Sequence, residues 1–146
     1  MQFQIFVALA AGLVLPIQAL INGRLAAGVG GAFVASNISF LVAAVVLLLV
    51  QLVLGKPLPS LAQLASVPAL YWIGGALGAV YVTGAITSVS ALGPTAAICL
   101  IIAGQILGAL TVDYFGILAA TAKSMSILRI LGALLVMAGA VLVVTS

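Results

Sequence analysis

The sequence predicts an all-α integral membrane protein, a bundle of five transmembrane helices with almost none of the chain in water. Three observations predict this class. Of the 146 residues, 66% are hydrophobic, only 3% are charged, and the apolar residues form long runs with short breaks between them. A soluble domain carries roughly a quarter charged residues, because its surface faces water. Four basic side chains and one acidic side chain cannot cover such a surface, so the surface of this chain must face lipid.

The apolar runs have the lengths that a bilayer requires. A hydrocarbon core of about 30 Å needs about 20 apolar residues in a helix. On this scale the chain is a single domain over residues 1–146 with helices at about 3–21, 32–54, 68–89, 94–114 and 127–144. The first run lacks the basic residues that precede the apolar part of a signal peptide, so we expect a retained membrane helix. Five spans would place the two termini on opposite sides of the membrane.

Short breaks separate the predicted helices. The first helix is expected to end at residues 22–24, and a glycine-rich link over 28–31 leads to the second helix. Two prolines within 55–59 close the next joint as a turn, and the stretch 60–67 is expected at the membrane interface. Gly93-Pro94 then breaks the chain, and proline suits the first turn of the helix that follows.

Glycines recur at spacings that place them on one face of a helix. In lipid, helices associate through close van der Waals contact, which small residues permit. Packing within one chain and packing against another subunit both fit this pattern. The candidate helix-packing residues are Gly74, Gly78, Gly104, Gly108, Gly132 and Gly139.

The few charges bear on partners and orientation. The basic residues are scattered, so a nucleic-acid partner is not expected despite the net charge of +3. The side of the N-terminus would hold Lys56, Lys123 and Arg129, and the opposite side only Arg24, a difference of 3 − 1 = 2. The positive-inside rule then favours a cytoplasmic N-terminus. Such a small difference is also what a chain that inserts in both orientations would show.

Several motifs, in this order, resemble the drug/metabolite transporter superfamily. They are Asn22-Gly23-Arg24 after the first helix, Gly93-Pro94, Gly104-Gln105-x-x-Gly108, Asp113-x-Phe115-Gly116 and the glycine-rich last helix. More narrowly, the whole chain resembles the half-length branch of five-helix proteins, long grouped as a family of unknown function. The resemblance implies half of a ten-helix inverted-repeat architecture in the bacterial cytoplasmic (inner) membrane. It implies a dimer, either an antiparallel homodimer with dual topology or a pair with an oppositely oriented five-helix homologue.

Polar groups at membrane depth are costly, so each is a candidate for function. The candidate substrate-binding residues are Gln18, Asn22, Asn37, Tyr81 and Gln105. For the amides, bonding between helices and lining of a pathway remain equally open. Thr83, Thr87 and Ser88 are expected to bond to carbonyls of their own helix.

Two charged residues are candidates for the mouths of a pathway. Arg24 is either an interfacial residue that reaches for the headgroups or a positive charge that attracts an anionic substrate group. Asp113, the only acid of the chain, is either a cap or salt bridge to Lys123 or Arg129, or a gate or proton carrier.

No catalytic residues, metal site or cofactor are expected, because the chain has no histidine, one cysteine and one acid. The first helix also lacks the buried glutamate through which the related four-helix multidrug exporters exchange cations for protons. The leading prediction is a small-molecule transporter that works as a dimer by alternating access, with the lipid bilayer as its surroundings. The alternative is a non-transporting accessory or assembly subunit of another membrane protein.

Overall fold

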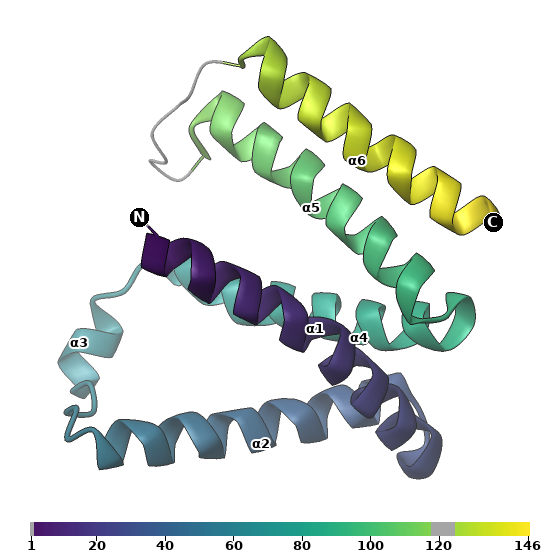
Figure 1. Cartoon of the computed structure of the whole chain (residues 1–146). Helices are drawn as coiled ribbons and strands as arrows, with labels where there is room; N and C mark the ends of the chain where they lie inside the picture. Colours follow the sequence, from purple (N-terminus) through teal and green to yellow (C-terminus); the bar gives the residue numbers. More distant parts are fainter. Residues whose placement is uncertain (1, 118–124) are drawn as a thin grey trace. The chain divides into compact units, whose positions relative to one another are not determined.

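The computed structural model describes residues 2–117 and 125–146, and the regular secondary structure in these ranges is helical throughout (Figure 1). Five helical segments are long and apolar enough to cross a membrane, which confirms the predicted all-α membrane fold. They are α1 (Gln2–Val29), α2 (Ala32–Val53), the pair η1 (Ala69–Trp72) and α4 (Ile73–Leu92), α5 (Pro94–Phe115) and α6 (Ile127–Thr145). The short helix α3 (Leu61–Ala65) lies between α2 and η1.

The first helix is longer than the sequence predicted. The expected break at residues 22–24 is absent, and α1 continues to Val29. The chain instead reverses at Gly30 and Gly31, whose φ angles of 92° and 122° are accessible mainly to glycine. With 28 residues, α1 is about 42 Å long at 1.5 Å per residue, well beyond the roughly 30 Å of hydrocarbon.

The predicted interfacial stretch over 60–67 contains α3. Ser60 caps this helix. Its hydroxyl accepts a hydrogen bond from the backbone N–H of Gln63, and the side-chain oxygen of Gln63 accepts one from the backbone N–H of Ser60. The span after it begins at Ala69 as a 3₁₀ turn and becomes an α-helix at Ile73.

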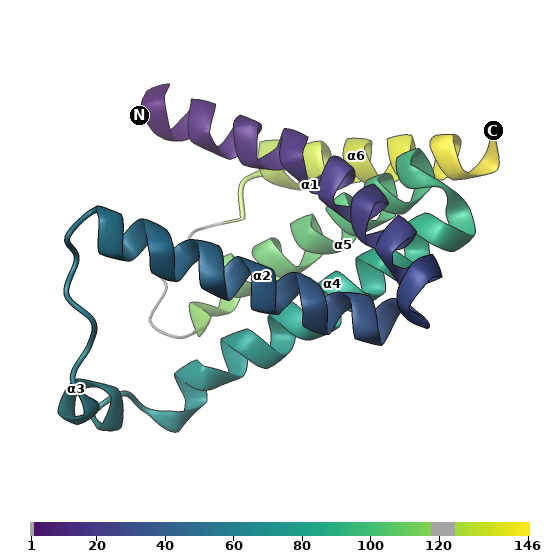
Figure 2. The same cartoon turned by 90° about the horizontal axis from the view of Figure 1, so that it is seen from below.

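The chain divides into two compact units, Met1–Thr87 and Ser88–Ser146. In the first unit α1 packs on α2, and a small core joins the end of α1, the start of α2 and the second half of α4. Ala26, Ala35 and Ile86 form the centre of this core. Figures 1 and 2 both show α2 and α4 close together near the start of α2 and farther apart toward α3.

In the second unit α5 and α6 pack against each other. Gly116, with a φ of 60°, ends α5 in the left-handed conformation and donates to the carbonyl of Val112. Ser126 caps the start of α6. Ala133 and Ala140, seven residues apart, are the buried residues of α6.

Candidate functional site

Side-chain hydrogen bonds link the three long helices of the first unit. The Asn22 amide on α1 donates to the Ser39 hydroxyl on α2 at 3.2 Å. The hydroxyls of Ser36 on α2 and Thr83 on α4 lie 2.8 Å apart. Asn22 and Ser36 are only 6% and 3% exposed. Because a buried polar group must be bonded to be tolerated, these bonds specify how α1, α2 and α4 meet.

The direction of the Ser36–Thr83 bond follows from the number of protons available. The Ser36 hydroxyl has one proton, and it donates that proton to the carbonyl of Ala32 at 2.8 Å. With the Ser36 proton on the Ala32 carbonyl, Thr83 is the donor between the two hydroxyls. Thr87 likewise uses its proton within α4, on the carbonyls of Thr83 and Gly84 at 3.1 and 2.9 Å. The oxygens of all three hydroxyls keep free lone pairs but no free proton.

An open cavity of about 430 Å³ lies beside this hydroxyl pair, between α2 and α4. Its α2 wall follows the spacing i, i+3, i+4, i+7, which is one face of a helix. Its α4 wall is a second such face. The lining residues are Phe33, Ser36, Asn37 and Phe40 from α2, and Ala79, Val80, Thr83, Gly84 and Thr87 from α4. The cavity is thus apolar and aromatic, with a few polar groups and no charged side chain.

Of the five predicted substrate-binding residues, Asn37 lines this cavity. Asn22 lies in the same unit, but its amide is engaged with Ser39. Gln18 and Gln105 are exposed on α1 and α5, and Tyr81 is half-buried on α4; none of these three lines the cavity. A common substrate site for all five residues remains a prediction.

Most residues of the cavity carry no functional signal in the sequence. Phe33 and Phe40 lie within a long apolar run, and Thr83 was expected to bond to its own helix, as Thr87 does. The repeated spacing 33, 36, 37 and 40 is the signal that could have identified the α2 wall. Only the fold shows that residues 79–87 face it.

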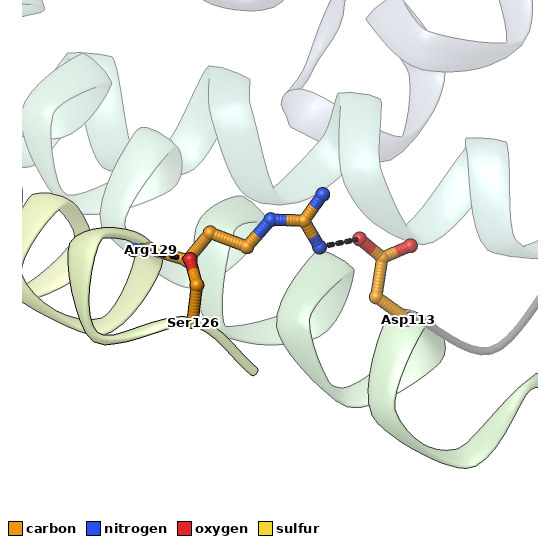
Figure 3. A network of polar contacts seen from close by, with 3 residues as sticks. All are labelled: Asp113, Ser126 and Arg129. Carbon is orange, nitrogen blue, oxygen red and sulfur yellow. Dashed lines mark hydrogen bonds and ion pairs between the residues drawn. The ribbon is translucent and has the colours of Figure 1, made fainter. Parts of the chain in front are cut away.

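An ion pair joins the helices of the second unit near the break between them (Figure 3). A guanidinium nitrogen of Arg129 lies 3.2 Å from a carboxylate oxygen of Asp113, and the Arg129 amide donates to the Ser126 hydroxyl at 3.3 Å. The predicted salt bridge between Asp113 and Arg129 is therefore present. Lys123, the other predicted partner, lies outside the described residues. Both paired side chains are more than a third exposed, so the pair contributes at most about 1 kcal/mol.

Arg24 occupies a different place from the one predicted. It lies within α1 rather than past its end, and its side chain is exposed. Whether it attracts an anionic substrate group stays a prediction.

The predicted packing glycines differ in their surroundings. A Cβ atom at Gly78 would lie 3.6 Å from the ring of Phe40, an ordinary van der Waals contact between α4 and α2. Within their own units, the other five (Gly74, Gly104, Gly108, Gly132 and Gly139) have no atom within 4 Å of such a Cβ. Alanines such as Ala26, Ala35, Ala133 and Ala140 form the tightly packed positions instead.

Within residues 2–117 and 125–146, no three histidine, cysteine or acidic side chains come together as a metal site would require. The described side chains offer hydrogen bonds and apolar surface to a bound molecule.

Comparison with known proteins agrees with a transport function. Residues 3–142 match a family model described as "Putative inner membrane exporter, YdcZ". Neither the curated proteins nor the solved structures contain a significant match. The length of 146 residues fits the half-length branch, and the five apolar helices fit a multi-pass protein in contact with the lipid bilayer. The chain therefore belongs to this family, within the drug/metabolite transporter superfamily.

Proposed function

We propose that the protein exports a small molecule across the inner membrane as an antiparallel homodimer that works by alternating access. The observation that carries this proposal is a set of unpartnered amides. Gln18, Asn37 and Gln105 lie on three membrane-spanning helices, are exposed, and make no hydrogen bond within the described part of the chain. An amide left unbonded in hydrocarbon costs several kcal/mol. Contact with a second copy and with a polar substrate removes this cost.

The odd number of candidate spans and the distribution of charges support the opposite orientation of the two copies. Two five-helix chains inserted in opposite directions supply the ten helices of an inverted-repeat transporter. The difference of two basic residues between the sides provides little preference for one orientation. The open faces at Gly104, Gly108, Gly132 and Gly139 leave room for close approach of a partner helix.

Each polar candidate has a part in this proposal. Gln18, Asn37, Tyr81 and Gln105 line the route between the two copies, and Asn22 joins them in a state of the transport cycle in which its bond to Ser39 opens. Arg24 and Asp113 stand at its mouths. The Asp113–Arg129 pair is the gate, because an exposed ion pair of small net energy can open and close at little cost.

The first experiment determines on which side of the membrane the C-terminus lies. Because Cys99 is the only cysteine, the Cys99→Ser chain with one cysteine added after Ser146 reports this position alone. A membrane-impermeant maleimide should label some copies in intact cells and the remaining copies only after the membrane is opened. Labelling of every copy from one face would refute the antiparallel homodimer and point to an oppositely oriented homologue.

Purification tests the exporter against the accessory subunit. A homodimer without a stoichiometric larger protein is expected for an exporter. Constant recovery with a different membrane complex would contradict the proposal, since an accessory subunit has no need of a pathway lined by amides.

A further inference from the structure

The cavity between α2 and α4 has the size and composition of a binding site for a small molecule. Ligand pockets usually measure about 300–1,000 Å³ and combine apolar and aromatic walls with a few polar groups. This cavity measures about 430 Å³. A dry apolar cavity of about 150 Å³ accepts one benzene ring, so the volume here suits a molecule of about two fused rings.

The lack of charged residues in the cavity lining disfavours an ionic ligand. Its nine lining residues are all uncharged. A charged ligand placed there would lose its hydration without meeting a counter-ion, which is strongly unfavourable at membrane depth. The ligand is therefore uncharged.

The hydroxyls of the cavity favour a ligand that can donate a hydrogen bond. Ser36, Thr83 and Thr87 have each committed their single proton, to the Ala32 carbonyl, to Ser36 and to the carbonyls of α4, respectively. Their oxygens can only accept further hydrogen bonds. The Asn37 amide, without a partner in the described chain, adds another acceptor and two donors. A ligand with an N–H or O–H group fits this acceptor-rich wall better than one with acceptors alone.

Two aromatic rings bracket these polar groups. Phe33 and Phe40 are seven residues apart, about 10 Å along α2, with Ser36 and Asn37 between them. Rings in offset or edge-on contact with a flat ligand add to its affinity beyond the area that they cover.

We infer that the α2–α4 cavity is the binding site for the exported molecule, and that this molecule is an uncharged, flat aromatic compound that carries a hydrogen-bond donor. This inference rests on the proposed exporter function. It identifies the chemical class of the substrate and places its recognition within one chain, while the transport route needs two.

The test uses three fluorine-labelled probes of similar size with the full chain in lipid nanodiscs. Fluoroindole is uncharged and carries one N–H donor, fluoronaphthalene lacks the donor, and N-methylfluoroquinolinium is a cation. Fluorine NMR separates saturable binding from partitioning into lipid, which grows in proportion to probe concentration. Fluoroindole should bind saturably, fluoronaphthalene about two- to tenfold more weakly as one lost hydrogen bond predicts, and the cation without saturation.

Variants then assign the binding to this cavity. Gly84 lines the cavity, and a Cβ added at this position would have no atom within 4 Å, so Gly84→Leu should fill the space without displacing a neighbour. Its binding of fluoroindole should fall about tenfold or more, because a side chain now occupies the site of the ligand. Gly75→Leu, on the same helix with equally open surroundings but outside the cavity, is the matched control and should bind normally. Ala79→Leu repeats the test should Gly84→Leu not fold.

Three outcomes of the binding measurements would overturn the inference: only proportional partitioning of fluoroindole, equal loss in Gly84→Leu and Gly75→Leu, or stronger saturable binding of the cation. Efflux of fluoroindole from proteoliposomes distinguishes this inference from the proposed function. Saturable, Gly84-dependent binding without efflux would uphold the cavity and contradict export. Efflux that Gly84→Leu leaves unchanged would uphold export and contradict the cavity.

Discussion

The helices of the two units are held together by different kinds of contact. In the first unit, α1, α2 and α4 are joined by the Asn22–Ser39 and Ser36–Thr83 hydrogen bonds, and an aromatic, partly polar cavity lies beside the second bond. In the second unit, α5 and α6 meet through alanine and aliphatic side chains, with one ion pair near the break between them.

The cavities of the two units show the same contrast. The space between α5 and α6, about 280 Å³, is lined by Cys99, Ile102, Val136, Gly139, Ala140 and Val143, and offers almost no hydrogen-bonding capacity. The cavity between α2 and α4 is larger and carries three hydroxyls and an amide. The hydrogen-bonding groups that line cavities are therefore concentrated in the first unit, while the single amide of the second unit, Gln105, lies outside its cavity.

The largest expected effect concerns that amide. Gln105→Leu should abolish transport while leaving yield and dimer intact, because the proposed pathway loses its only amide from the second unit. Thr111→Val is the control on the same helix, since the Thr111 hydroxyl bonds to the Leu107 carbonyl one turn earlier. Efflux from proteoliposomes measures both variants. Normal transport by Gln105→Leu would remove Gln105 from the site and confine the polar chemistry to the first unit.

The next effect tests how tightly the first unit packs. Ala35 is fully buried in its core, so Ala35→Leu should lower the free energy of unfolding by about 1–3 kcal/mol through overpacking. Ala43→Leu on the exposed part of α2 should change it by less than about 0.5 kcal/mol. Unfolding of the purified protein in micelles measures the difference. Equal stabilities would show that the core around Ala35 is loosely packed.

A smaller effect is expected for the bond between α2 and α4. In a double-mutant cycle of Ser36→Ala and Thr83→Val, the coupling energy should be about 0.6 kcal/mol and at most about 1.7 kcal/mol. The same unfolding assay provides the four stabilities. A coupling of zero would mean that the two hydroxyls do not hold the helices together, and the contrast between the units would weaken.

The smallest effect is expected at the ion pair of the second unit. Asp113→Asn should destabilise the protein by about 0.5 kcal/mol or less, because solvent and salt screen a pair this exposed. The loss should shrink further at high salt. A larger, salt-independent loss would show that the pair is shielded from solvent in the assembled protein.

Particular residues show how far the sequence could predict the fold and the site. Pro94 and the long apolar runs were sufficient to locate the spans, because hydrocarbon admits only helices of a certain length. Asn22-Gly23 misled, since an Asn-Gly pair commonly marks a turn in water, whereas here Asn22 is buried and bonded inside α1. The packing glycines were also a weak guide, because the closest positions are occupied by alanines.

The sequence by itself determined the membrane class, the number of spans, the absence of a carboxylate in the first helix and the family. These features follow from the composition and the local order of residues, because every polar group placed in hydrocarbon costs free energy wherever it lies in the fold. Only the tertiary structure decided that Ser36 meets Thr83, that Asp113 pairs with Arg129, and which faces enclose the α2–α4 cavity. Residues 36 and 83 are 47 positions apart, and no local rule specifies such a pairing, because it depends on the rotation of each helix against its neighbours.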